Sequence, residues 1–445
     1  MKRHLLTMAA TVLLVSVAHS QKQWTLNDCI DYAMQNNITL KKSRLQRLSS
    51  SEDVKQSKAA LLPSLSASTN QSFGYRPWQD SGTTTVTNGT VNTKVNKTYY
   101  NGSYGLNASW TVWNGGRNTN QVKQYELSEQ QAELNEAETA NSIQEKIAQL
   151  YVQILYLSEA VNVDKASLET SQKNEDRGRE MVEVGKMSKA DLAMLSSQRA
   201  SDEYAIIEAQ SQLATYKLQL KQLLEITDDQ PFEIVSPDAT DGQALAEIPS
   251  LMAIYEEALA TRPEMQSAQL AVKSSDLSID IAKAGKLPSI NMTGGLGTST
   301  NSLSNKGWGN QLKTNFDASV GASLSLPIFD QRQTKTNVNK ARIQKEQALL
   351  DMLDKQKQLY QTIEGYWLDA QTNQQKFRAA TTTLESEQLS YDLLQEQFRL
   401  GLKNIVELMT GKDRLLTSQQ NLLQSKYMTI LNLQMLKFYG GAKLR

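Results

Sequence analysis

The side chains that most often perform catalysis are scarce in this chain. Its two histidines, His4 and His19, lie within the first twenty residues, and its single cysteine is Cys29. If these first residues are removed as a signal, the mature chain contains no histidine. It then cannot run a Ser-His-Asp or Cys-His mechanism, and it offers no imidazole to a metal ion. Carboxylate-pair chemistry remains open, because 47 aspartate and glutamate residues are present. We therefore expect no enzyme, metal or cofactor, with a carboxylate-dependent glycosidase as the enzymatic alternative.

The first twenty residues have the pattern of a secretory signal. Lys2 and Arg3 give a positive start, a short apolar run follows, and Ala18-His19-Ser20 matches a small-x-small cleavage site. The apolar run is too short to span a bilayer comfortably. We expect residues 1–20 to be removed, which takes both histidines away, and an uncleaved anchor is the alternative.

The charge balance argues against one class of partner. Lysine plus arginine number 47 and so do aspartate plus glutamate, so the formal net charge is zero. A nucleic-acid-binding protein needs a basic face. We therefore expect no nucleic-acid partner.

Two long stretches without proline predict long helices. Proline is absent from residues 114–230 and 328–445, and proline breaks helix interiors. In the second stretch, apolar residues recur every seven positions, at Ile363, Ala370, Phe377, Leu384, Tyr391 and Phe398. This repeat predicts a narrow seam between supercoiled helices. A helix of about 60 residues spans roughly 90 Å, a length that suits a span between two membranes better than a compact domain.

Four segments alternate apolar and polar residues and predict strands with one apolar face. Two clear strands are expected at about 99–113 and 314–326, and two weaker ones precede them at about 64–76 and 289–300. The segments between the paired strands, about Trp78 to Lys97 and Ser302 to Lys313, are rich in Thr, Asn, Gly and Ser. We expect them to be surface loops.

Matched features indicate an internal twofold repeat. At an offset of 216, Val184-Gly185 corresponds to Leu400-Gly401. Further upstream, Leu62-Pro63-Ser64-Leu65 resembles Leu287-Pro288-Ser289-Ile290 at an offset of 225. We attribute the difference of nine between these offsets to loop length.

The repeat gives the expected domain organisation. Each half should contain a helix, a strand pair, a long helix, a turn and a further helix. The expected parts are a signal at 1–20, a first repeat at 21–226, a linker or equatorial segment at 227–249, and a second repeat at 250–445. The expected long helices cover about 116–183 and 331–399, and the helices that follow them cover about 188–226 and 403–438.

These elements, in this order, resemble the TolC-type outer-membrane efflux proteins, the outer-membrane factors of tripartite efflux and secretion systems. The matching elements include the opening Trp24-Thr25-Leu26-Asn27-Asp28-Cys29-Ile30 and the two Leu-Pro-Ser entries to strand pairs. They also include Leu326-Pro327-Ile328-Phe329-Asp330 after a strand, and the two glycine turns, each with an acid six residues later. The resemblance covers nearly all of residues 21–440. Single motifs are degenerate, but their order and duplication are specific.

The resemblance implies a mainly α fold with a β-barrel part. Three chains would give four strands each to a twelve-stranded outer-membrane β-barrel, continuous with a long periplasmic α-helical barrel. A single chain could not form such a barrel in the membrane, because its two open strand edges would leave peptide groups without hydrogen bonds in lipid. The lipid-facing residues would be Tyr104, Leu106, Trp110, Val112, Phe316, Val320 and Leu324.

The resemblance also implies a function, that of a passive exit duct in the outer membrane of a Gram-negative bacterium, with a periplasmic extension. The expected partners are a periplasmic adaptor (membrane fusion) protein, an inner-membrane RND or ABC pump, outer-membrane lipid and further copies of the chain in a homotrimer. The adaptor would dock at the glycine turns, on Gly185, Lys186, Met187, Gly401, Leu402 and Lys403. A structural envelope coiled coil without a pore is the alternative function, and a plain helix C-cap is the alternative role for each glycine.

A periplasmic gate beside these turns is the last implication of the resemblance. Its residues would be Asp191, Phe398, Lys403 and Glu407. The family pattern has tyrosine and arginine around the second turn, where this chain has Phe398 and Lys403. Phenylalanine donates no hydroxyl hydrogen bond, and lysine lacks the bidentate fork of arginine. We therefore expect a weak latch that rests mainly on Asp191 with Lys403, and a solvated surface pair is the alternative.

Overall fold

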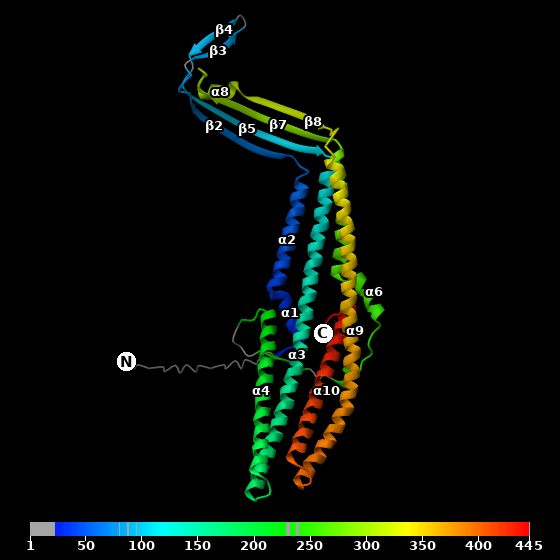
Figure 1. Cartoon of the computed structure of the whole chain (residues 1–445). Helices are drawn as coiled ribbons and strands as arrows, with labels where there is room; N and C mark the ends of the chain where they lie inside the picture. The colour runs from blue at the N-terminus through cyan, green and yellow to red at the C-terminus, as the bar shows by residue number, and fades with distance from the viewer. Residues whose placement is uncertain are drawn as a thin grey trace, which may run out of the picture. The chain divides into compact units, whose positions relative to one another are not determined.

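The structure is a computed structural model, and it describes residues 23–79, 81–86, 89–94, 96–227, 232–236 and 240–444. The expected signal, residues 1–20, lies outside the described residues. The chain divides into two compact units (Figure 1). The first unit comprises the described residues of Met1–Lys41 together with Thr139–Arg262 and Leu359–Arg445, and the second comprises Lys42–Glu138 and Pro263–Gln358.

The second unit contains a four-stranded antiparallel sheet with the strand order β2-β5-β7-β8. Because β5 pairs with β7, the strand pairs of the two sequence halves form one sheet. The strands are β2 (Ser64–Tyr75), β5 (Thr98–Trp113), β7 (Ser289–Asn301) and β8 (Asp317–Ser325). Helix α2 (Ile38–Ala59) leads towards β2, and α7 (Pro263–Lys283) leads through the short 3₁₀ turn η1 (Ala284–Lys286) towards β7.

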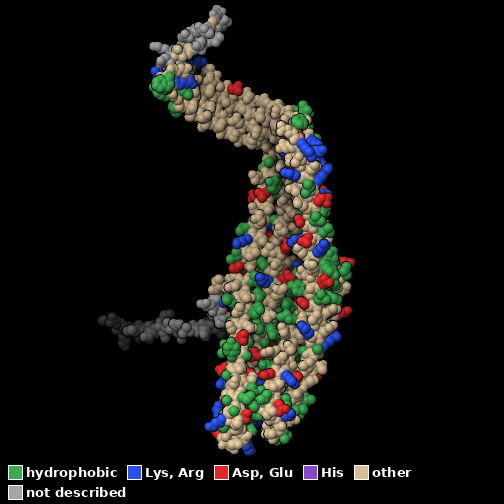
Figure 2. All heavy atoms as spheres, in the orientation of Figure 1, with side chains coloured by type: hydrophobic (Ala, Val, Ile, Leu, Met, Phe, Trp, Pro, Cys, Tyr) green, Lys and Arg blue, Asp and Glu red, His purple; other side chains and the backbone are tan. Residues whose placement is uncertain are grey.

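The register gives this sheet two chemically different faces. Directly opposed residues on neighbouring strands share a face. Leu106 of β5 is opposite Leu296 of β7, which is in turn opposite Ala318 of β8. The next residue of β5, Asn107, is opposite Ser66 of β2. One face is therefore apolar and the other polar, and Figure 2 views the sheet from the polar side, where few hydrophobic side chains are visible.

The structure places most of the expected lipid-facing residues on the apolar face. Tyr104, Leu106 and Trp110 pair with the residues of β7 that share one face, and Val320 and Leu324 pair with further residues of that same face. Val320 and Leu324 are 83% and 71% exposed, whereas Tyr104 is half-buried, with the ring of Trp308 at 6.2 Å from its own.

Two of the expected positions differ. The register shifts between Thr111 and Trp113, so strict alternation stops before Val112, and Trp113 pairs with Ile290 on the face that carries Trp110. Phe316 lies before β8, which begins at Asp317 and not at about 314. The reason is that the preceding residues form a helix, α8 (Trp308–Thr314).

The two segments expected as plain loops contain regular structure, so that expectation is wrong in part. The first contains an antiparallel hairpin of β3 (Ser81–Val86) and β4 (Gly89–Lys94). The second contains α8, which is held against β7 because Thr298 Oγ1 donates to the Leu312 carbonyl at 2.7 Å. Asn315 Nδ2 also donates to the Ser299 carbonyl at 2.7 Å.

The first unit is mostly helical. Two long helices, α3 (Arg117–Glu183) and α9 (Gln333–Arg399), run into it from the second unit. Each is followed by a shorter antiparallel helix, α4 (Lys189–Leu223) and α10 (Ile405–Tyr439), and Figure 1 shows the two resulting hairpins side by side with their tips at the same end. The remaining elements are α1 (Leu26–Asn36), α6 (Leu251–Thr261), β1 (Gln23–Trp24), β6 (Glu233–Ile234) and α5 (Asp241–Ala244).

Short elements also occupy the segment expected as a linker. Within the described part of 227–249, β6 pairs in parallel with β1, and α5 follows. Tyr151 of α3 holds this region, because its hydroxyl donates to the Val235 carbonyl at 2.6 Å. Cys29 of α1 is fully buried in the same unit.

The predicted seven-residue seam of α9 is confirmed. Five of its six members, Ile363, Ala370, Phe377, Tyr391 and Phe398, are buried and the sixth, Leu384, is half-buried, whereas most of the α9 surface between them is exposed. None of the helices in the described ranges is long and apolar enough to cross a membrane.

The internal repeat is visible in the positions at which equivalent elements of the two halves begin. Arg117 and Gln333 begin α3 and α9, and these starts differ by 216, as do the starts of α4 and α10. Ser64 and Ser289 begin β2 and β7, and these starts differ by 225. The change from 225 to 216 therefore falls between the first strand of each half and its long helix, where the connections differ in length.

Candidate functional site

The two hairpin tips end their long helices in the same way. At the first tip, the Lys186 N–H donates to the Met181 carbonyl at 2.8 Å, and the Gly185 N–H donates to Val182. At the second tip, the Leu402 N–H donates to the Gln397 carbonyl at 2.9 Å, and the Gly401 N–H donates to Phe398. This pattern is the Schellman motif, which needs a left-handed residue after the helix.

Both tips have a glycine in the left-handed conformation. Gly185 has φ 73° and Gly401 has φ 74°, a conformation that glycine adopts without the steric cost of a Cβ. A Cβ built on either glycine would meet no atom within 4 Å. The prediction of left-handed turns is confirmed, and the open space shows that no close approach within the chain requires glycine there.

The expected docking residues are unevenly exposed. Gly185, Lys186, Gly401 and Leu402 are exposed, and Leu402 presents an apolar side chain to solvent. Met187 and Lys403 are half-buried, and Met187 packs against the apolar cluster between the hairpins. Of these residues, the exposed ones therefore belong to the turns themselves, and Met187 belongs partly to the core.

The two expected gate acids lie where each tip leads into its next helix. Glu407 is the third residue of α10, and its N–H donates to Asn404 Oδ1 at 2.9 Å while the Asn404 N–H donates to its carboxylate at 3.2 Å. Asp191 is the third residue of α4, and its N–H donates to Ser188 Oγ at 3.0 Å. Both acids therefore take part in helix caps.

The expected Asp191–Lys403 latch is not formed within one chain. Lys403 Nζ instead lies 2.6 Å from Glu407 Oε1, one turn further along α10. The Asp191 carboxylate accepts the Ser188 hydroxyl at 2.8 Å. The hydrogen bond from Lys403, with the one from the Asn404 backbone, lowers the pKa of Glu407 below its ordinary value.

Phe398 lies in the interior of the chain. It is 6% exposed and packs in an apolar cluster with Leu195 of α4 and with Ile405 and Leu408 of α10. Its ring joins the end of α9 to the other hairpin helices. Within the chain, the structure therefore places Lys403 beside Glu407 and keeps Phe398 apart from both in the core.

Ser188 and Asn404, which form the helix caps, are not among the predicted site residues. A signal was present, because each is followed three residues later by an acid, which is the spacing of a capping box.

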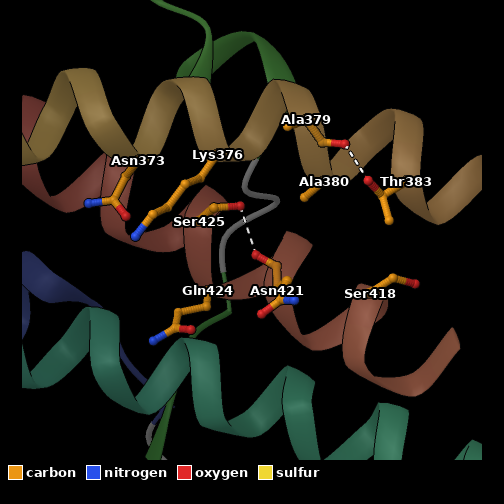
Figure 3. Close-up of a pocket in the computed structure, with 9 residues that line it drawn as sticks. All are labelled: Asn373, Lys376, Ala379, Ala380, Thr383, Ser418, Asn421, Gln424 and Ser425. Carbon is orange, nitrogen blue, oxygen red and sulfur yellow. Dashed lines mark hydrogen bonds between the residues drawn. The ribbon is translucent and has the colours of Figure 1, made fainter. Parts of the chain in front are cut away.

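A polar groove lies between α9 and α10, further along the second hairpin. Figure 3 shows its lining, with Asn373, Lys376 and Thr383 on α9 and with Asn421 and Ser425 on α10. Its volume is about 420 Å³. The lining offers amides, hydroxyls and one positive charge, so it suits hydrogen bonding to polar groups. Among the described residues, no group of three or more His, Cys, Asp or Glu side chains is arranged to hold a metal ion.

Comparison with known proteins identifies the family. The family model described as outer membrane efflux protein matches residues 29–225 and 254–442. The chain belongs to this family. The two matched segments fit the internal repeat, and the predicted family, its outer-membrane location and its role in efflux are confirmed.

Individual relatives agree with this family. The outer membrane efflux protein BepC of Brucella suis biovar 1 is 23% identical over 421 residues, which cover 94% of this chain and 85% of that protein. A crystal structure of CusC, described in terms of folding and transmembrane channel formation, superposes with a TM-score of 0.79 at 18% identity and covers 94% of this chain and 92% of CusC. The outer membrane protein VceC of Vibrio cholerae gives a TM-score of 0.75 at 16% identity, covering 94% and 97% of the two chains. These structures share the fold of this chain.

Proposed function

We propose that this protein is the passive exit duct of a tripartite efflux or secretion system, built from three copies of the chain. In this assembly the sheet lines a pore through the outer membrane, and the helical hairpins extend into the periplasm. The observation that carries the proposal is the sheet, which has one uncovered apolar face, one polar face and two unpaired edges.

The sheet edges support closure between chains. β2 and β8 are the outer strands, and each pairs with one neighbour within the described sheet. Every neighbouring pair is antiparallel, so β8 runs opposite to β2. β8 of one copy beside β2 of the next would therefore continue the same antiparallel pattern. Closure of this kind leaves no open strand edge. The peptide groups of an open edge would find no hydrogen-bond partner in lipid.

The two faces then have different surroundings. An exposed face with Leu106, Val320 and Leu324 is stable against lipid and unfavourable in water. The opposite face carries Ser, Asn, Thr and Gly side chains, such as Ser66, Asn107 and Ser319. A polar face composed mostly of small side chains suits a water-filled bore through which solutes pass.

The hairpin tips are the proposed contact with a periplasmic adaptor (membrane fusion) protein, which joins the duct to an inner-membrane RND or ABC pump. The exposed turns at Gly185-Lys186 and Gly401-Leu402 are the proposed docking surface. The proposed gate lies beside them, on Asp191, Lys403 and Glu407, with Phe398 supporting it from the core. A Lys403–Glu407 pair about 40% exposed contributes little to stability, so its proposed role is electrostatic, at the narrow end of the duct.

Conductance measurements test the proposal. The purified protein should be a trimer in mild detergent and should conduct ions across a planar bilayer. A stable monomer at micromolar concentration would contradict closure between chains. Trimers that never conduct would favour the alternative function, a structural coiled coil of the envelope without a pore.

A further inference from the structure

The apolar face of the sheet becomes polar towards the end at which β2 and β7 finish. Gly102 of β5 is opposite Gln71 of β2 and Thr300 of β7. Four positions along β5, Leu106 is opposite Leu296. Residues two or four positions apart on a strand share a face, so Gln71 and Thr300 extend the face that carries Leu106. Figure 1 shows α8 and the β3–β4 hairpin at this same end of the sheet.

The polar groups at this end form a connected cluster. The Tyr100 hydroxyl donates to Gln71 Oε1 and lies 3.3 Å from the Tyr104 hydroxyl. Gln71 Nε2 donates to Thr69 Oγ1 at 2.8 Å. Gln71 and Thr69 are exposed, and after these bonds the Thr69 hydroxyl hydrogen and the second amide hydrogen of Gln71 remain as donors. The cluster therefore presents donors that suit the oxygen atoms of a ligand.

One member of the cluster lacks a partner. Thr300 is 2% exposed, and its Oγ1 forms no hydrogen bond with the described residues. This oxygen lies over Gly102, where a Cβ would come within 2.8 Å of it and closer still to the Tyr100 hydroxyl and Gln71 Oε1. Gly102 therefore leaves room for polar atoms from three strands. Because buried polar groups nearly always have partners, the unpaired hydroxyl indicates that a group outside the chain completes the cluster.

Helix α8 adds positive charge beside the cluster. The Trp308 ring meets the Tyr104 ring edge-on, with centroids 6.2 Å apart, so α8 lies over the same face. Gln311 fixes the helix there, because its side chain accepts the last N–H of β7 and donates to the Lys306 carbonyl, each at 2.7 Å. Lys306 and Lys313 are exposed, and neither forms an ion pair with a described residue. Both charges are therefore available to an anion.

The face combines the groups that an anionic lipid needs. Leu106 and Leu296 are exposed and suit acyl chains. Trp308 is 56% exposed, and tryptophan is enriched at the boundary between lipid and water. Lysines near a membrane surface attract anionic head groups. The hydroxyl and amide groups lie between the apolar residues and the end of the sheet, where they would meet the hydroxyls of a sugar.

The width of the site favours one class of lipid. The cluster reaches Gln71 on β2, whereas α8 lies against β7, and these strands are two strand spacings, or about 10 Å, apart. A phosphorylated disaccharide spans this width, and a single glycerophosphate group is narrower.

We propose that this end of the sheet, with α8, binds the head group of an anionic glycolipid in the outer leaflet of the outer membrane. Its phosphates lie against Lys306 and Lys313, and its sugar oxygens accept hydrogen bonds from Gln71 and Thr69. Its acyl chains run along the apolar face. This inference rests on the proposed function, because it takes the apolar face to contact lipid and this end of the sheet to lie at the outer surface.

The test measures lipid binding to delipidated full-length trimers by native mass spectrometry. The probes are lipid A with two phosphates, lipid A without phosphates, and phosphatidylglycerol. We expect the parent protein to prefer the first. Lys306→Gln/Lys313→Gln should bind it about tenfold more weakly. The control, Lys286→Gln/Lys335→Gln, removes two exposed charges at the opposite end of the sheet and should bind like the parent.

Gln71→Leu tests the contact with the sugar. Its side chain is exposed, so the change leaves the packing of the chain intact. We expect this variant to bind phosphatidylglycerol as the parent does and to lose the preference for lipid A with two phosphates. Ser72→Ala, the next residue on β2 and on the opposite face, is the control and should keep the preference.

Three results would overturn the glycolipid site. They are equal binding of the three probes by the parent, unchanged binding by the lysine double variant, and displacement of lipid A by inorganic phosphate, which would make the ligand a soluble anion. Conductance in a planar bilayer distinguishes this site from the duct, because the lysines lie on the face away from the proposed bore. If the parent conducts without a lipid preference, the site is lost and the duct stands. If it shows the preference without conducting, the duct is lost and the site stands.

Discussion

Asp191 and Glu407, which are 216 residues apart, occupy the same position in the two hairpins. Each is the third residue of the helix after its tip, and the N–H of each bonds the side chain of the preceding N-cap residue. An acid six residues after the tip glycine thus has a local structural cause, the closing of a helix N-terminus. A role of these acids in gating would be additional to their role in capping the helix, and the variants below separate the two roles.

Glu407→Gln and Asn404→Ala separate the cap from the charge. The first keeps an oxygen at the third helix position and removes the charge, so we expect lower cation selectivity and weaker block by divalent cations at unchanged trimer stability. The second keeps the charge and removes the cap, so we expect a loss of about 0.5–2 kcal/mol at the start of α10 with selectivity preserved. Single-channel recordings and thermal unfolding measure these effects. Full selectivity in Glu407→Gln would place the acidic ring elsewhere.

The same carboxylate predicts a pH dependence. The pKa of folded Glu407 lies below its ordinary value of 4.5 because of Lys403 and the Asn404 backbone. Its contribution to the tip is therefore complete above that ordinary value and is lost as the pH falls through the lowered pKa. Protection against hydrogen exchange at the start of α10, corrected for the intrinsic pH dependence of exchange, should stay high at neutral pH and fall only in strong acid. Glu407→Gln is the control and should lack this fall in protection.

Asp164 should show the opposite sign. Burial raises its pKa, and the hydrogen bond from Gln420 at 2.9 Å opposes that effect only in part. The charged form therefore costs stability at neutral pH, and the cost disappears as the pH falls below the raised pKa. Asp164→Asn keeps an oxygen for Gln420, so we expect a small gain in thermal stability at pH 7 and none in acid. A loss of stability at pH 7 would mean that the charge is needed.

Leu106→Arg and Asn107→Arg test the two faces of the sheet. These neighbours on β5 point to opposite faces, and both lie near the middle of the strand. Arginine on the lipid side of a membrane barrel costs about 2–4 kcal/mol at the bilayer midplane. We expect Leu106→Arg to reduce trimer yield in the outer membrane and Asn107→Arg to assemble normally with altered conductance. The reverse result would assign the faces the other way.

Substitutions at Gly401 separate strain from docking. Gly401→Val forces a Cβ into a left-handed conformation at a cost of about 1–2 kcal/mol, whereas asparagine tolerates that conformation. If the turn is the docking surface, both variants should reduce export while the trimer stays intact, because both add a side chain to open space. Gly365→Ala, within α9, is the control and should export normally. Normal export by Gly401→Asn would mean that Gly401 serves only as a helix C-cap.

Periodicity allowed the sequence to predict the seam of α9 and the two faces of the sheet. Each depends only on which residues lie three, four or two positions apart. Phe398 continues the seven-residue repeat of Tyr391, which predicts a core residue, and the structure places its side chain in the core of the chain. The gate role that the family resemblance suggests for Phe398 stays a prediction.

The features that periodicity missed depend on other interactions. The β3–β4 hairpin was missed because its threonine-rich sequence resembles a loop. The shift before Trp113 follows from pairing with β7, which a single strand does not reveal. Lys412 of α10 and Asp202 of α4 form a buried ion pair across 210 positions, so their contact follows from which helices are neighbours and not from any local pattern.

The nearly equivalent tips have a consequence for stoichiometry. Three chains with two tips each would present a ring of six, in which two kinds alternate. The kinds share one backbone turn but differ in sequence, with Lys186-Met187 after one glycine and Leu402-Lys403 after the other. A partner with three subunits would be able to bind one kind of tip alone. A partner with six identical subunits would have to bind both kinds, so alternate subunits would contact different side chains.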